Sequence, residues 1–267
     1  DLLGQLPITT LKGVGAALAE KLMKLNIRTV QDMLFHLPRQ YEDRSRITPI
    51  GGLRPGLSAQ VDADVVLSDV VFGRRRSLVV KVQDGTGTLT LRFYHFNNAQ
   101  KDAMARGLRL RIFGEARLGA TGIEMYHPEY SMISDAMPPP SDTLTPIYPV
   151  TEGVTQLRLR PLMTQALLRI SSSNLPDWLP SEENRGWSLA AALRFVHAPP
   201  NDADRVALVE GRHPAQQRLA FEELVAHQLN LQKRRAEIRA HQATALPPAS
   251  DLQHNFLATL PFPLTGA

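Results

Sequence analysis

An alternating segment that ends in a cluster of aromatic rings constrains this chain more than any other feature. The segment runs from Leu89 to Phe96 and reads Leu-Thr-Leu-Arg-Phe-Tyr-His-Phe. Because successive side chains of a β-strand point to opposite faces, the pattern predicts one apolar face and a second face that carries Arg92, Tyr94 and Phe96. A fold built around this segment therefore needs a β-sheet.

The second face of this predicted strand has two interpretations. A cation beside two rings on a solvent-facing strand suits the stacking of unpaired nucleobases and contact with their phosphates. The alternative is a sheet that is buried on both faces, which is costly because it would bury the charge of Arg92. We therefore expect Arg92, Tyr94 and Phe96 to bind nucleic acid.

The elements around this segment follow the order of a small closed barrel. A short helix over residues 97–106 is predicted between the third and fourth of five strands. The predicted strands cover residues 58–72, 78–82, 89–96, 108–116 and 123–130. This order is the signature of the five-stranded oligonucleotide-binding barrel, the OB-fold.

Helical patterns lie on both sides of the predicted barrel, so the predicted fold class is α+β with several domains. Near the start, residues 16–25 and 30–34 are predicted helices, and Gly13 and Gly15 form a turn before the first. In a helix-hairpin-helix such a turn directs its amides at a DNA phosphate, whereas a hairpin used only for packing needs the same glycines. The predicted parts are a helical hairpin over 1–50, an OB-fold over 51–135, a proline-rich linker over 136–154 and a helical region over 155–267.

Basic residues near the barrel suggest a path for phosphates. Arg74, Arg75 and Arg76 form a turn between the first two strands, and Lys101 lies on the short helix. Arg106, Arg109 and Arg111 would extend the same path. The alternative is a solubilising loop, since the net charge of +4 permits a nucleic-acid partner without requiring one.

Several functions are excluded by residues that the sequence lacks. It contains no cysteine, which excludes disulfides and thiolate metal sites. No Gly-Lys or Asp-Glu dipeptide is present, so the phosphate-binding loop and the acidic magnesium motif of ATP-driven motors are missing. We expect no catalytic activity from this chain alone. No apolar run approaches the ~18 residues of a membrane span, so a cytoplasmic protein is expected.

Motifs along nearly the whole chain resemble the amino-terminal part of the RecG family, the bacterial ATP-dependent helicases of branched DNA. The order and spacing of the motifs carry this resemblance. They are Leu11–Gly15, Val30–Leu34, His36–Arg39, Tyr41–Arg44, Asp84–Gly87, His127–Tyr130, Leu144–Pro149, Thr151–Gly153, His213–Gln216 and Leu260–Ala267.

The resemblance implies a role at replication forks and Holliday junctions. In that family the barrel is a wedge whose aromatics cap separated strands, while an ATPase motor beyond this chain reverses the stalled fork. By position the two capping rings match Tyr94 and Asn98. Because Asn98 is not aromatic, Phe96 is the expected substitute.

The same resemblance implies how a nucleotide is bound, and further expectations concern the partners of the chain. Phe262, Leu264 and Thr265 match part of the adenine site of the full-length protein, which uses ATP and Mg²⁺. Without the motor, we expect very weak ATP binding or none. The expected partners are branched and single-stranded DNA, and the chain is expected to be a monomer associated with the bacterial nucleoid. As an alternative function, the barrel would dock a protein such as single-strand-binding protein.

Overall fold

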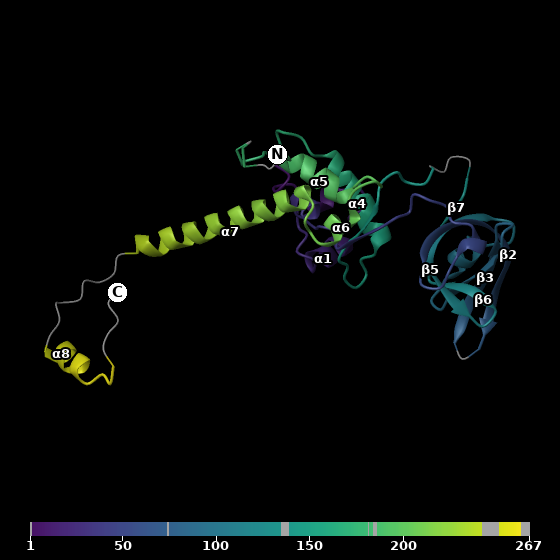
Figure 1. The fold of residues 1–267 in the computed structure, drawn as a ribbon, viewed down its shortest axis with the longest axis horizontal. Helices are drawn as coiled ribbons and strands as arrows, with labels where there is room; N and C mark the ends of the chain where they lie inside the picture. The colour runs from purple at the N-terminus through teal and green to yellow at the C-terminus, as the bar shows by residue number, and fades with distance from the viewer. Residues whose placement is uncertain are drawn as a thin grey trace. The chain divides into compact units, whose positions relative to one another are not determined.

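The computed structural model describes residues 2–73, 75–134, 139–180, 182–183, 186–241 and 251–262. It divides into two compact units, Asp1–Ala220 and Phe221–Ala267. The first unit has two hydrophobic cores, one inside a β-barrel and one among helices. Figure 1 shows these as the blue and teal strands of the barrel and as a separate group of helices that includes α1, α4, α5 and α6.

The barrel is a single sheet that closes on itself. Its strands lie in the order β2-β3-β4-β6-β5-β7, and pairing of β2 with β5 completes the closure. The strands are β2 (Ser58–Phe72), β3 (Arg76–Gln83), β4 (Thr88–Phe93), β5 (Arg109–Gly119), β6 (Gly122–Tyr126) and β7 (Glu129–Met132). Helix α3 (Asn98–Asp102) separates β4 from β5 in the chain. The predicted α+β class and OB-type barrel are thereby confirmed.

The alternation predicted for the aromatic segment is present on β4, but the strand is shorter than expected. Leu89, Leu91 and Phe93 are all buried in the barrel core, as predicted. The strand ends at Phe93 rather than Phe96. The cause is local, because the Asn97 side chain caps α3 and the backbone must leave the sheet to begin that helix.

The fifth predicted strand, residues 123–130, is two strands in the structure. The break falls at His127, which has a positive φ of 48°, and at Pro128, which has no amide hydrogen for a ladder. Before the break, β6 pairs in parallel with β4; after it, β7 pairs antiparallel with β5. Strand β5 pairs with both β6 and β7, so the break ends only the contact with β4, and the parallel pairing before it places the end of β6 beside the end of β4.

The second core is built from both ends of the first unit. Its helices are α1 (Ala16–Met23), α2 (Val30–Leu34), α4 (Gln156–Leu168), α5 (Leu189–His197) and α6 (Arg205–Val209), preceded by the 3₁₀ turn η1 (Ile8–Thr10). Leu22 and Leu34 from the start of the chain pack in one cluster with Leu159 and Val196. The sequence predicted two separate helical parts, whereas the structure joins them around this common core, which we call the helical core.

The predicted proline-rich linker contributes a strand to this arrangement. Within it, β8 (Thr145–Ile147) pairs antiparallel with β1 (Gln40–Glu42). A second 3₁₀ turn, η2 (Ile50–Gly52), precedes the barrel. The segment that leaves the barrel therefore lies against the segment that enters it.

The two remaining helices lie in the region over 155–267 that the sequence predicted to be helical. Helix α7 (Pro214–Ala240) begins in the first unit, where Ala215 and Leu219 are buried, and continues into the second. Its Arg218 side chain is fully buried and pairs with Asp177 at 2.7 Å. Helix α8 (Asp251–Ala258) lies in the second unit. Among the described residues, no helix is both long and apolar enough to cross a membrane.

Candidate nucleic-acid interface

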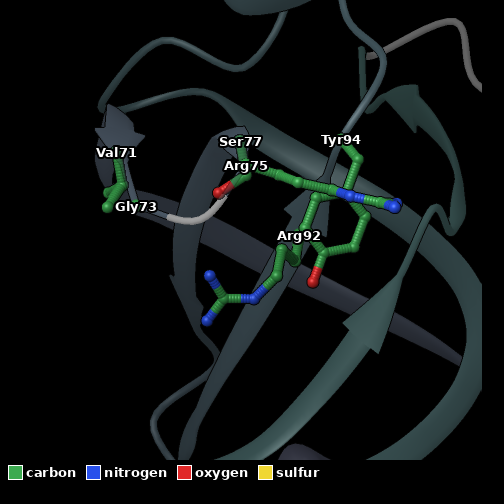
Figure 2. Close-up of a pocket in the computed structure, with 6 residues that line it drawn as sticks. All are labelled: Val71, Gly73, Arg75, Ser77, Arg92 and Tyr94. Atoms are coloured by element: carbon green, nitrogen blue, oxygen red, sulfur yellow. The ribbon is translucent and has the colours of Figure 1, made fainter.

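A groove on the barrel lies between the end of the β2–β3 hairpin and the end of β4. Figure 2 shows its lining, which consists of Val71, Gly73, Arg75, Ser77, Arg92 and Tyr94. In that view the side chains of Arg75 and Arg92 run in opposite directions, with the Tyr94 ring beside them. The groove thus combines one aromatic ring with two cations, whereas the sequence pattern placed two rings, Tyr94 and Phe96, beside Arg92.

Arg92 differs from the prediction because a buried carboxylate neutralises its charge. The parallel pairing of β4 with β6 places it next to Glu124, and Arg92 Nη2 lies 3.0 Å from Glu124 Oε1. The hydrogen bond from Arg92 lowers the pKa of Glu124, whose side chain is only 3% exposed. Arg92 is therefore a fixed, partnered cation and is less suited to hold a phosphate than a free one.

Tyr94 belongs to a cluster of four rings that we call the aromatic cluster: Tyr94, His95, Tyr126 and His127. The rings of Tyr94 and Tyr126 are stacked, with centroids 6.1 Å apart and planes at 25°. The His127 ring lies 5.7 Å from that of Tyr94 and 6.1 Å from that of His95. This cluster offers flat π surfaces at the edge of the groove.

Tyr126 is held in place by the same carboxylate that binds Arg92. Its hydroxyl donates a hydrogen bond of 2.8 Å to Glu124 Oε2, and this bond raises the pKa of Tyr126. Arg117 lies 6.0 Å from the centroid of the Tyr126 ring. Sequence reasoning missed Tyr126 and His127, because only the parallel register of β4 and β6 sets Tyr126 opposite Arg92. The alternating pattern of residues 123–130 predicts a strand, but it does not predict which strand lies beside it.

Phe96 does not share the surface of Tyr94 as expected. It follows the end of β4 and packs, partly buried, against the barrel core. The Arg76 guanidinium lies over its ring at 4.7 Å from the centroid. Its expected role as a substitute capping ring depended on an ideal strand that continues to residue 96, and the strand does not.

The remaining predicted DNA-binding residues, which are the expected phosphate contacts and Asn98, are dispersed. Arg75 is exposed at the groove, while Asn98 and Lys101 are exposed on α3. Arg74 lies outside the described residues. Arg111 is paired with Asp62 at 2.9 Å, so it does not extend a free basic path.

The glycine turn at the start of the chain belongs to the helical core and not to the barrel. Gly13 has a φ of +91°, which favours glycine, and Gly15 precedes α1. The neighbouring Lys12 amide donates to Gln165 Oε1 at 2.8 Å, and Gln165 Nε2 donates in return to the Lys12 carbonyl. These bonds to α4 support the packing alternative, while phosphate binding by the turn stays a prediction.

The predicted adenine contacts fall in the second unit. Phe262 is exposed, and Leu264 and Thr265 lie outside the described residues. Among the residues that the structure describes, no three His, Cys, Asp or Glu side chains gather as metal ligands.

The fold and the comparisons with known proteins together show the family of this chain. Proteins that bind single-stranded nucleic acid commonly present aromatic rings beside cations on such a barrel. A sequence model of the RecG wedge domain matches residues 7–170. The chain belongs to the RecG family.

Two similar proteins from other bacteria can be aligned with this chain over its whole length. The ATP-dependent DNA helicase RecG of Pasteurella multocida is 46% identical over 100% of this chain. The RecG helicase of Escherichia coli strain K12 is 45% identical, also over 100% of this chain. In both cases the match spans 39% of the relative. A solved structure described as RecG bound to a three-way DNA junction matches this chain with 27% sequence identity and a TM-score of 0.64. The match covers 99% of this chain and 36% of the chain in that structure.

Proposed function

We propose that this chain recognises branched DNA and acts as the strand-separating wedge of an ATP-dependent helicase. That helicase reverses stalled replication forks into Holliday junctions during DNA repair and recombination. The observation that carries the proposal is the stacked pair Tyr94–Tyr126, which borders a groove with Arg75 and Arg92 on the barrel of a RecG family member. The junction-bound RecG structure that it resembles supports the same role.

The physical basis is the exchange of one stacking partner for another. When a base pair opens at a branch point, each base loses the neighbour on which it was stacked. An aromatic side chain recovers ~1–3 kcal/mol per base, without reading its identity. Tyr94 and Tyr126 therefore favour the open junction over closed duplex, while Arg75 attracts the backbone.

The test is the affinity of the chain for a three-way fork, a matched duplex and a single strand, measured by fluorescence anisotropy. Tyr94→Ala is compared with Tyr94→Phe, which keeps the ring. We expect Tyr94→Ala to weaken fork binding about fivefold to 150-fold, and Tyr94→Phe to resemble the wild type. The same comparison for Tyr126→Ala and Tyr126→Phe separates the ring from its hydrogen bond to Glu124.

The dependence of affinity on salt gives a second, independent arm of this test. Replacing Arg75 and Arg76 by Ala should flatten the slope on duplex DNA by up to ~0.9 log units for each phosphate that the variant no longer neutralises. Arg158→Ala is the control, because this arginine is exposed on α4, outside the barrel. Unchanged fork preference in Tyr94→Ala, together with an unchanged salt slope, would contradict the proposal.

The remaining functional expectations are proposals that the described site does not address. We propose that ATP and Mg²⁺ are bound by the full-length protein and that this chain alone binds ATP weakly or not at all, which calorimetry would measure. A contact with single-strand-binding protein, a monomeric state and an association with the bacterial nucleoid in the cytoplasm are further proposals of the same kind.

A further inference from the structure

The tip of the β2–β3 hairpin has two different faces. Its last pairs are Val71 with Ser77 and Phe72 with Arg76. Because neighbouring residues of a strand point to opposite faces, these two pairs lie on opposite sides of the hairpin. Val71 and Ser77 line the groove with Tyr94, so Phe72 and Arg76 occupy the face that points away from it.

The second face continues outward from the barrel core. Val70 and Leu78 form the next pair along it, and Leu78 is fully buried while Val70 packs against the core. Further out, Arg76 covers the ring of Phe96. Phe96 is therefore engaged in packing and leaves Phe72 as the outermost ring on this face.

Phe72 is exposed to an extent that the fold does not explain. Its exposed fraction is 78%, although it ends a strand whose earlier residues form the barrel core. A cation, Arg76, is its cross-strand partner, and Arg75 follows close by in the same tip. A solvent-facing ring among cations on a projecting hairpin is what the stacking of an unpaired base requires.

We propose that Phe72 is a second base-stacking site for single-stranded DNA, on the face of the β2–β3 hairpin opposite the aromatic cluster. This inference rests on the proposed function and adds the site of the other strand. One separated strand stacks on Tyr94 and Tyr126, and its former partner strand stacks on Phe72. The hairpin tip then lies between the two separated DNA strands, and Arg76 lies on the same face as the DNA strand that stacks on Phe72.

The experiment uses a fork that carries the fluorescent base 2-aminopurine at the first unpaired position of one template strand or of the other. Stacking on a ring quenches this base, so each strand reports its own contact. We expect Phe72→Ala to relieve quenching on one strand and Tyr94→Ala on the other. Phe72→Ala should also weaken fork binding about fivefold or more.

Two control variants distinguish base stacking from a general apolar contact. Leu168→Ala removes an equally exposed apolar side chain, 78% exposed, from helix α4 and should change nothing. Phe72→Leu keeps apolar area but removes the ring, so it should behave like Phe72→Ala. Wild-type affinity and quenching in Phe72→Leu would overturn the assignment of Phe72 as a stacking ring.

Failure of this inference and failure of the proposed function have different signatures. If Phe72→Ala changes neither strand while Tyr94→Ala changes one, the Phe72 site is wrong and the proposed function stands. If both variants act on the same strand, the opposite-face assignment is wrong. If neither variant alters fork binding or quenching, both proposals fall.

Discussion

At the scale of single residues, the buried histidine of α5 shows how burial sets a protonation state. The His197 Nε2 atom lies 2.7 Å from the carbonyl oxygen of Leu34, and its Nδ1 lies 3.0 Å from the hydroxyl of Tyr148. A carbonyl only accepts, so Nε2 carries the hydrogen and Nδ1 accepts from Tyr148. Burial lowers the pKa of His197 to about 4, because the charged ring would lose its hydration.

This histidine predicts how stability depends on pH. In the unfolded chain its pKa returns to ~6.5, so the unfolded state takes up a proton first as the pH falls. The contribution of His197 is therefore fully present above pH 6.5 and is lost toward pH 4, with a slope of up to ~1.4 kcal/mol per pH unit. Urea unfolding between pH 7 and pH 5 should show this loss in the wild type and a smaller one in His197→Gln. If the free energy of unfolding falls equally with pH in the two proteins, groups other than His197 cause the pH dependence.

At the scale of secondary-structure elements, one carboxylate connects the barrel to helix α4. Glu129 on β7 accepts hydrogen bonds from Arg44 at 2.7 Å and from Arg160 of α4 at 2.9 Å. Arg44 also lies over the ring of Phe113 at 3.8 Å from its centroid. Although burial opposes ionisation, these two arginines keep the pKa of Glu129 low, at about 2.

Removing the charge of Glu129 should weaken this connection. Glu129→Gln leaves Arg44 and Arg160 without their common partner, and we expect the free energy of unfolding to fall by ~1–3 kcal/mol because the cluster is only partly buried. Glu115→Gln is the matched control, since its pair with Arg117 is exposed and should contribute below ~1 kcal/mol. Chemical unfolding measures both. An equal decrease in the free energy of unfolding in the two variants would show that the Glu129 cluster stabilises the fold no more than an exposed ion pair does.

At the scale of the whole molecule, the first unit is organised around the barrel core and the helical core. The barrel core comes from one continuous stretch of chain. The helical core combines the start of the chain with residues beyond the barrel, so the barrel is an insertion between the two halves of a helical body. This topology predicts that damage at one end of the chain spreads to distant helices and not to the adjacent barrel.

Two buried leucines test that organisation. Leu34→Ala removes volume from the helical core and Leu91→Ala from the barrel core, and both side chains are fully buried. Each should cost ~2–5 kcal/mol within its own core. Amide hydrogen exchange should show reduced protection in α2, α4 and α5 for Leu34→Ala, and in β3 and β4 for Leu91→Ala. An equal reduction in both parts from either variant would mean that they unfold as one unit.

Patterns within a single segment were read from the sequence with good accuracy. The apolar face of residues 89–93, the helix near 16–25, the helical character of the region after 155 and the barrel class all depend on local periodicity, which the chain carries in its own order of residues. Errors came where one element meets another. The strand predicted to reach Phe96 stopped early because Asn97 starts a helix, and Arg92 proved to be paired with a carboxylate 32 positions away.

The sequence by itself determined that this chain forms a small barrel of the oligonucleotide-binding type between helical segments, with Tyr94 beside a cation at its edge. These features follow from alternation, capping and residue type, which act over a few positions. Only the tertiary structure decided that Tyr126 stacks on Tyr94, that Glu124 holds Arg92, and that Phe72 faces away from the groove. The physical reason is that strand register and parallel pairing are set by packing across the whole barrel, and no short stretch of residues encodes them.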